Sequence, residues 1–213
     1  WLPYYAASNR PTQLRDVGRS LSQGDCGPGT VGIDRQGQKL TLDVARVPRG
    51  PTPGTHDRPG ETFQLLSPDV AYIKLSSIKA TDVAGYIVRA LGTRGLIIDI
   101  RNYPSEFVVF ALGGHLVSGP TPFARFTGID LPNPGTFTWG EPVMLSPILP
   151  KYTGKVVVLV DEVSQSQAEY TTMAFRAAGV TVVGSTTAGA DGNVSAIPLP
   201  GGLRTMISGL GVF

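Results

Sequence analysis

The sequence predicts an α/β fold, and two observations carry that prediction. From about residue 66 onward, strand-like and helix-like segments alternate, which is typical of βαβ units with a mostly parallel sheet. Two of the strand-like segments are continuously apolar: "GLIIDI" at 95–100 and "KVVVLVD" at 155–161. Continuously apolar strands are typical of a sheet with both faces covered, so we expect cover on both sides.

The first half of this predicted core alternates strand, helix, strand and helix. Residues 69–77, "DVAYIKLSS", form the first predicted strand, and "ATD" is a helix-start signal. The segment "VAGYIVRAL" at 83–91 predicts a helix, because Val83, Ile87 and Leu91 fall on one face. The strand at 95–100 follows, and then "SEFVVFALGGHLV" at 105–117 predicts a second helix.

The second half begins with a stretch rich in Pro, Gly and Thr, residues 118–153, which holds short strand-like pieces such as "PFARFTGI". After the strand at 155–161, the sequence predicts a helix at 166–178 and a strand at 180–184. A final pair of strands is expected within 202–213.

A smaller α+β segment precedes this core. Residues 9–21 predict a short helix, and the alternation around Leu40 and Leu42, after the turn "RQGQ", predicts an antiparallel hairpin. These elements, within residues 1–47, are too few to make a domain alone. Residues 48–65, which begin "PRGPTPGTHDRPGE", are dense in Pro and Gly and are expected to link this segment to a core at 66–213.

Composition excludes several classes of protein and site. The net charge is +2, and no basic patch points to nucleic acid or to a membrane surface. No apolar run approaches the ~20 residues that a helix needs to cross a bilayer. The single cysteine, Cys26, excludes an internal disulfide framework, and the sequence predicts no metal site and no cofactor. Since the chain starts without Met and ends within an apolar pattern, we expect a fragment that is truncated at its C-terminus.

Two turns at predicted strand ends are the places where we expect chemistry. In parallel sheets, catalytic groups gather at the carboxyl ends of the strands. The strand at 95–100 runs into "RNYPSEF", and the strand at 155–161 runs into "EVSQSQAE". If the two strands are neighbours, both turns open on the same side. Ser166 then starts a helix, where free N–H groups and the helix dipole favour a developing anion.

A structural role for these serines is the alternative. Ser is a preferred helix-capping residue, so Ser164 or Ser166 can simply satisfy an N–H group at the helix start. The surrounding "SQSQA" is also not the Gly-x-Ser-x-Gly turn of α/β-hydrolases.

The segment "VVVLVDEVSQSQAEYTTMAFRAAGVTVVGSTTAGADG" resembles the catalytic segment of the C-terminal processing (tail-specific) serine peptidases. "VAYIKLSS" resembles the strand that opens the core of that family, and "GLIIDIRNYPSEF" resembles its strand-and-turn motif of hydrophobic-Asp-hydrophobic-Arg-Asn-x-x-Gly. The turn here lacks the glycine pair of that motif. The helix and hairpin before the linker resemble the second half of a PDZ-like domain. The resemblance implies a ClpP/crotonase-like core preceded by a partial PDZ-like segment.

The resemblance also implies roles for individual residues. The nucleophile falls on Ser166, and Glu169 falls on the helix glutamate that follows it. The oxyanion donors are expected to be the backbone N–H of Gln167 and one N–H of the "PSE" turn, at Ser105 or Glu106.

One departure from the family concerns the general base. The family typically has a lysine in the loop after its Val-Gly strand, and the matching position here is Ala190. A serine without a base is a poor nucleophile. Lys74, in the opening strand, is the best replacement candidate, because a buried lysine can lose its proton near neutral pH. The alternative is an ordinary strand lysine whose head reaches solvent.

Other polar residues have weaker signals. Asp191 and Asn193 in the same loop are candidates for substrate binding, or else they only serve the turn. Tyr170 is a further candidate for contact with substrate, although a packing role is expected for an aromatic residue there. His56 lies in the linker and His115 on or beside an apolar helix face, so neither completes a Ser–His pair.

The sequence therefore predicts a serine endopeptidase that cleaves peptides or unfolded proteins. A catalytically inactive peptide- or ligand-binding protein on the same fold is the alternative, and a PDZ-type adaptor is a third. The resemblance alone suggests the bacterial periplasm, the envelope or secretion. The oligomeric state is left open.

Overall fold

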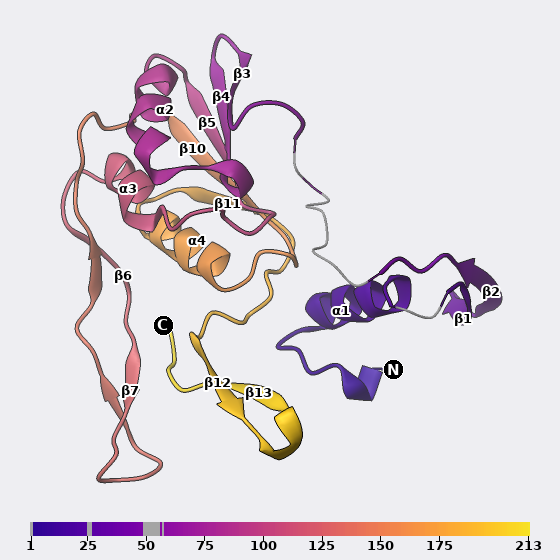
Figure 1. Cartoon of the computed structure of the whole chain (residues 1–213). Coiled ribbons are helices and arrows are strands. Elements are labelled where there is room, and N and C mark those ends of the chain that lie inside the picture. Colours follow the sequence, from indigo (N-terminus) through magenta and orange to yellow (C-terminus); the bar gives the residue numbers. More distant parts are fainter. Residues whose placement is uncertain (1, 25–26, 49–55, 57) are drawn as a thin grey trace. The chain divides into compact units, whose positions relative to one another are not determined.

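The computed structural model describes residues 2–24, 27–48, 56 and 58–213, and these form two compact units (Figure 1). The units divide between Thr55 and His56, inside the stretch 48–65 that we expect to be a linker. Cys26 and most of that stretch lie outside the described residues. The PDZ-like character of the first unit stays a prediction.

The first unit consists of a helix and a hairpin, as predicted. Its elements are η1 (Leu2–Tyr4), α1 (Arg10–Ser22), β1 (Gly29–Arg35) and β2 (Gln38–Val44). Asn9 caps α1, because its side chain accepts the N–H of Thr12 at 3.0 Å. Gln36 and Gly37 both have positive φ, which gives the tight turn that joins the antiparallel strands β1 and β2.

The second unit is built on a five-stranded, mostly parallel sheet, which confirms the α/β prediction. The strands are β3 (Phe63–Ser67), β4 (Val70–Lys74), β5 (Gly95–Asp99), β10 (Lys155–Val160) and β11 (Thr181–Gly184). Their order is β11-β10-β5-β4-β3, and only β3 runs antiparallel. β5 and β10 are neighbours, so their carboxyl ends meet at one edge. β3 starts inside the stretch that was expected to be a linker.

Three helices accompany the sheet: α2 (Val83–Ala90), α3 (Val109–Gly113) and α4 (Gln167–Ala177). Short 3-10 turns complete this layer: η2 (Leu75–Ser77), η3 (Ala80–Asp82) and η4 (Gly114–Leu116). The predicted helix at 105–117 is wrong in its first turn, because Ser105 instead donates its N–H and its hydroxyl to the carbonyls of Leu75 and Ile78.

The core lies on one face of the sheet. Leu96 and Ile98 of β5 and Val158 and Val160 of β10 are buried among residues of the helices. The expected cover on both faces is wrong for the described chain, since the intervening residues of β10 are only half-buried and the edge strand β11 is exposed throughout. In β5 and β10, one apolar side of each strand therefore carries most of the packing, whereas Ala71, Tyr72 and Ile73 of β4 are all buried.

Two hairpins extend from this core. The stretch 118–153 forms a long arm of paired strands: β6 (Thr121–Ala124) with β9 (Val143–Leu145), and β7 (Thr127–Ile129) with β8 (Phe137–Trp139) (Figure 1). Near the C-terminus, β12 (Val194–Pro198) pairs with β13 (Arg204–Ser208) around η5 (Pro200–Gly202). The predicted strand pair within 202–213 is therefore wrong, because Gly201 and Gly202 at positive φ place the turn earlier.

None of the helices in the described ranges is long and apolar enough to cross a membrane.

Replacing Ile98 tests the single core face. Ile98 is buried in the middle of β5, in register with Ile73 of β4 and Val158 of β10. We expect Ile98→Ala to lower the free energy of unfolding by about 2–5 kcal/mol, because the cavity cannot collapse between two strands. Val88→Ala on the exposed side of α2 is the matched control, with an expected change within about 0.5 kcal/mol. Urea unfolding measures both, and equal losses would contradict this core.

Candidate active site

The two turns expected to hold the chemistry lie side by side at the carboxyl edge of the sheet. Ser164, in the turn after β10, donates its hydroxyl to the carbonyl of Ile100, which follows β5, at 2.8 Å. The same hydroxyl accepts the N–H of Asp161 at 3.1 Å. Because Ser164 is fully buried and both bonds are structural, its role is to tie the two turns together.

Ser166, between this turn and α4, has a backbone conformation that L-residues rarely adopt. Its φ is 54° and its ψ is −120°, outside the main allowed regions. Such a conformation costs on the order of 1–3 kcal/mol and persists only where the surroundings enforce it. Its N–H points to the carbonyl of Ala190, at 3.1 Å, and its carbonyl accepts the N–H of Tyr170 at 3.0 Å.

The carboxylate of Glu169 binds three backbone N–H groups around this turn. Oε1 accepts the N–H of Gly189 at 2.6 Å, and Oε2 accepts those of Ala190 at 2.9 Å and Ser166 at 3.2 Å. Glu169 is buried, and both its oxygens are engaged. We therefore interpret Glu169 as a positioning residue that fixes the loop 185–193 against the start of α4.

The two expected oxyanion elements are joined directly. The Gln167 side chain donates Nε2–H to the carbonyl of Glu106 at 2.8 Å, so the "PSE" turn lies against the start of α4. Gln167 is the first residue of α4, and its backbone N–H has no partner within the helix. The Ser105 N–H is already donated to Leu75 at 2.9 Å. Of the two turn donors, Glu106 is thus the better placed.

Lys74 ends β4 and is engaged elsewhere. Its Nζ donates to the carbonyl of Arg58 at 3.1 Å. In the described parts of the chain, no hydrogen bond joins the Ser166 hydroxyl to Lys74 or to any other basic side chain. The structure places Lys74 at the correct edge of the sheet, at the end of a strand two positions from β10.

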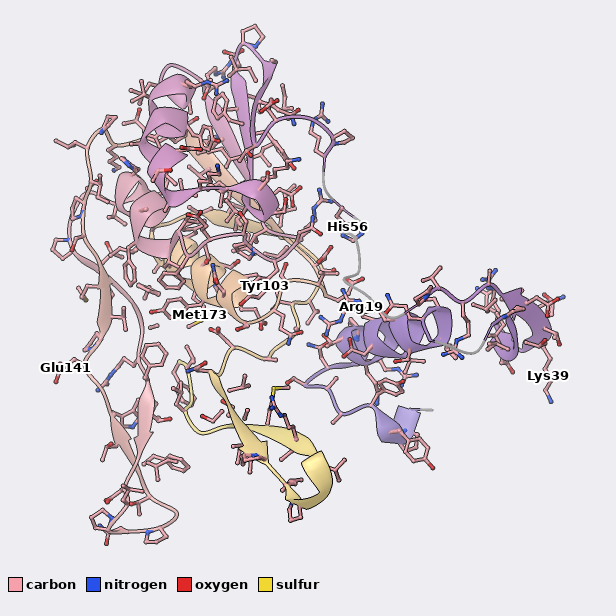
Figure 2. All side chains as sticks on the ribbon, in the orientation of Figure 1. Arg19, Lys39, His56, Tyr103, Glu141 and Met173 are labelled. Atoms are coloured by element: carbon pink, nitrogen blue, oxygen red, sulfur yellow. The ribbon has the colours of Figure 1, made fainter. Side chains whose placement is uncertain are left out.

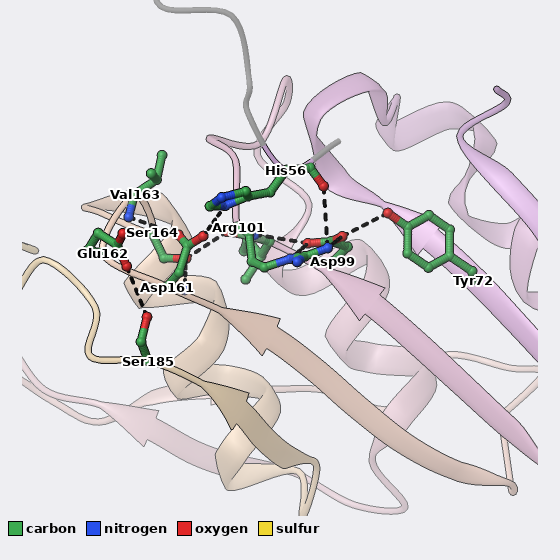
Figure 3. Close-up of polar contacts among 10 residues, drawn as sticks. His56, Tyr72, Asp99, Arg101, Asp161, Glu162, Val163, Ser164 and Ser185 are labelled. Carbon is green, nitrogen blue, oxygen red and sulfur yellow. Dashed lines mark hydrogen bonds and ion pairs between the residues drawn. The ribbon is translucent and has the colours of Figure 1, made fainter. Parts of the chain in front are cut away.

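A polar network crosses the same edge (Figure 3). Arg101 pairs with Asp99 at 2.6 Å, and Tyr72 donates its hydroxyl to the same carboxylate at 2.8 Å. Burial favours a raised pKa for Asp99, but the hydrogen bonds from Arg101 and Tyr72 outweigh it and hold that pKa below its ordinary value. Burial and the neighbouring Asp99 raise the pKa of Tyr72.

The His56–Asp161 pair in this network escaped sequence reasoning. Nδ1 of His56 contacts Oδ2 of Asp161, which is buried directly after β10. The carbonyl of His56 also accepts a bond from Arg101 at 3.3 Å. The pair joins residues 105 positions apart, so no local pattern could indicate it.

The loop candidates separate in the structure. Asp191 borders a cavity beside α4, and its Oδ2 is buried without a hydrogen-bond partner. Burial, assisted by the nearby Glu169, raises the pKa of Asp191 to about 7. Asn193 is exposed and precedes β12.

Tyr170 lies at the centre of an aromatic cluster that sequence reasoning missed. Its ring centroid is 5.0 Å from that of Phe123, 5.9 Å from Phe126 and 6.1 Å from Phe107. Burial, with a further contribution from Asp191, raises the pKa of Tyr170. The cluster lies beside Ser166, because Tyr170 stands one helical turn after it. His115 is packed, as expected, with Nδ1 bonded to the carbonyl of Pro150 at 2.8 Å.

No group of three or more His, Cys, Asp or Glu side chains in the described part of the chain could hold a metal ion.

The profile of the family "Peptidase family S41" matches residues 113–209, which include Ser166, α4 and the loop 185–193. The search among curated proteins gave no match.

Several solved structures share the fold. A candidate peptidase from Parabacteroides merdae ATCC 43184 aligns with a TM-score of 0.63 at 20% identity, over 75% of this chain and 54% of that one. The structure of mature CPAF complexed with lactacystin aligns with a TM-score of 0.66 at 15% identity, over 99% of this chain and 66% of that one. The photosystem II D1 C-terminal processing protease aligns with a TM-score of 0.50 at 14% identity, over 88% of this chain and 51% of that one. This chain thus spans about half to two thirds of the length of these proteins. At these identities the likeness shows the fold alone.

Glycine at position 166 tests the strain. Glycine tolerates positive φ, whereas alanine keeps the Cβ that opposes it. We expect Ser166→Gly to be more stable than Ser166→Ala by about 1 kcal/mol, since both variants lack the hydroxyl. Thermal unfolding of the two variants measures the difference. A glycine variant that is less stable than the alanine variant would contradict a strained turn.

The raised pKa of Asp191 predicts that the stability of the folded protein depends on pH. Its pKa of about 7 lies above the ordinary value of 3.8, so between these values the folded state keeps a proton that the unfolded chain releases. Stability therefore falls as pH rises through this window. Asp191→Asn cannot release the proton, so its melting temperature relative to wild type should rise from about pH 5 to pH 8. A difference that is constant over this range would show that the carboxyl has its ordinary pKa.

Proposed function

We propose that the site around Ser166 is the active site of a serine endopeptidase that cleaves peptides or unfolded proteins. The match of residues 113–209 to peptidase family S41 supports this proposal. The observation that carries the proposal is the strained backbone of Ser166 at a strand-to-helix turn. Nucleophilic serines occupy such turns in other hydrolases, although the Gly-x-Ser-x-Gly motif is missing here. Ser166 is the N-cap of α4, and Glu169 accepts its N–H as in a capping box. Capping residues usually have extended backbones, so capping alone does not account for this conformation.

The geometry supports acyl transfer in the following way. The Ser166 hydroxyl oxygen attacks the scissile carbonyl carbon while its proton passes to a base. The carbonyl oxygen becomes an oxyanion, which the N–H groups of Gln167 and Glu106 can stabilise. The C–N bond then breaks, the leaving amine takes the proton, and water releases the acyl group from Ser166.

The base is the open part of this proposal. Position 190, where related peptidases place a lysine, is Ala190, whose backbone serves the loop. Lys74 is the candidate that we propose, because it ends a parallel strand at the catalytic edge. To accept the proton, its Nζ has to leave the carbonyl of Arg58.

The proposed delivery of substrate follows from the first unit. A complete PDZ-like domain binds an extended peptide by adding it as a strand to a sheet edge. In this proposal the first unit is part of such a domain, and the protein works in the bacterial periplasm, in the envelope or outside the cell.

A non-catalytic peptide- or ligand-binding protein is the second candidate. Two observations favour it: position 190 carries no base, and Lys74 is bonded to Arg58 rather than to Ser166. Asp191 and Tyr170 beside the serine would then serve a bound ligand.

Three variants of the protein that carries this chain test the proposal with an unfolded substrate such as casein. We expect Ser166→Ala to abolish cleavage and Lys74→Ala to slow it at least about 100-fold, the usual effect of removing a general base. Lys79→Ala, an exposed lysine five residues along the chain, is the control and should keep full activity. Mass spectrometry of new N-termini follows the reaction.

The outcomes separate the candidates. Cleavage that survives Ser166→Ala would reject the nucleophile, and cleavage that survives only Lys74→Ala would reject that base. A wild-type protein that binds the peptide and never cuts it would favour the binding protein.

A further inference from the structure

An apolar cavity of about 720 Å³ lies between the hairpin β7–β8 and the C-terminal residues 207–213. Ile129, Phe137 and Trp139 line it from the hairpin, and Ile207, Leu210 and Phe213 line it from the other side. Phe137 remains 63% exposed and Trp139 55% exposed. Such a concentration of exposed aromatic surface is typical of a site for a binding partner.

The Trp139 ring is held in place before any ligand arrives. Its edge packs against Phe213, with ring centroids 5.0 Å apart, and the guanidinium of Arg125 lies 5.3 Å from its centroid. Phe213 is in turn fixed by two backbone hydrogen bonds to Arg125, at 2.6 and 2.9 Å. A fixed aromatic ring loses little conformational entropy on binding, which makes it an effective anchor.

A second cavity adjoins this one and borders residues that contact the nucleophile. It has a volume of about 650 Å³ and runs along one face of α4, where Met173 lies (labelled in Figure 2). At one end it is lined by Glu169 and Ala190, the two residues that accept the Ser166 N–H. At the other end it shares Ser208, Leu210 and Gly211 with the apolar cavity.

The two cavities differ in chemistry along their length. Near Ser166 the walls include the carboxylates of Glu169 and Asp191, whereas around Trp139 they are apolar and aromatic. A ligand that contacts both ends has to be long, extended and apolar at its far end. An unfolded polypeptide has these properties.

We propose that the cavity around Trp139 is a remote substrate site, which holds an apolar or aromatic segment of an unfolded polypeptide while Ser166 cleaves the chain several residues away. This inference rests on the proposed peptidase function and adds a substrate class to it: unfolded chains rich in aromatic residues. Two observations support it: the two cavities share lining residues, and the cavity beside α4 is lined by Glu169 and Ala190, which bond to Ser166.

The test compares long and short substrates. For each variant, kcat/KM is measured with carboxymethylated casein and with a four-residue chromogenic peptide that can occupy only the site at Ser166. We expect Trp139→Ser to lower the casein-to-tetrapeptide ratio of kcat/KM about tenfold, the effect of losing one buried aromatic anchor. Trp139→Phe should keep the ratio within about twofold of wild type, since it retains an aromatic ring.

Leu131→Ser is the matched control. Leu131 lies between β7 and β8 and is 83% exposed, but it does not line the cavity. Its ratio should equal that of the wild type. A fall of the same size for Leu131→Ser and Trp139→Ser, or an unchanged ratio for Trp139→Ser, would overturn the proposal.

A binding measurement separates this proposal from the peptidase function. In Ser166→Ala, the fluorescence of Trp139 is followed while carboxymethylated casein is added, with Trp139→Phe as the background. We expect a saturable change that Ile207→Ser weakens about tenfold. If the wild type cleaves neither substrate and this change is still seen, only the peptidase function fails. Fluorescence that does not respond to casein overturns the remote site, whether or not the protein is a peptidase.

Discussion

The geometry of the candidate site depends on the buried carboxylate of Glu169. This one group accepts N–H bonds from Gly189, Ala190 and Ser166, which belong to two segments of the chain. Bonds to a charged acceptor are stronger than bonds between neutral groups, so the carboxylate can offset the strain at Ser166. Glu169 follows Ser166 by less than one helical turn. Its carboxylate therefore holds the start of α4 against the loop 185–193.

The hydrogen bonds of Glu169 also explain how the loop 185–193 keeps its shape with alanine at position 190. Ala190 contributes through its backbone alone: its N–H binds Glu169, and its carbonyl accepts the N–H of Ser166. Neither contact involves the side chain. The arrangement of the loop around the serine therefore does not depend on the side chain at position 190, and the presence of the loop is no evidence for catalysis by itself.

The sequence predicted those parts of the structure that follow from local periodicity. The strands at 95–100 and 155–161 and the helix after Ser166 were predicted from apolar patterning, and the strands prove to be parallel neighbours. Patterning failed where tertiary contacts or turn chemistry override it. Ser105 is drawn to the carbonyls of Leu75 and Ile78, which shortens the predicted helix.

Long-range pairs could not be predicted at all. The aromatic rings around Tyr170 come from the turn after β5 and from β6 and the residues after it, all far from α4 in the sequence. The pairing of His56 with Asp161 likewise joins residues far apart. The positions of Ser166 and Glu169 were predictable by family resemblance, whereas their bonds were not. The same holds for Lys74, whose side-chain partner lies 16 residues away.

The bond between Lys74 and Arg58 links the candidate base to the residues before β3. His56 contacts Asp161 after β10 and Arg101 after β5. The backbone carbonyl of Arg58 accepts a hydrogen bond from the ammonium of Lys74 at the end of β4. His56 and Arg58 therefore contact residues at the carboxyl ends of three adjacent parallel strands, at the edge that carries Ser166. Hydrogen bonds from charged donors are stronger than those between neutral groups, so this contact favours the position of the Lys74 side chain on Arg58. The base role proposed for Lys74 requires its Nζ to leave the carbonyl of Arg58, so the geometry of Arg58 bears directly on that proposal.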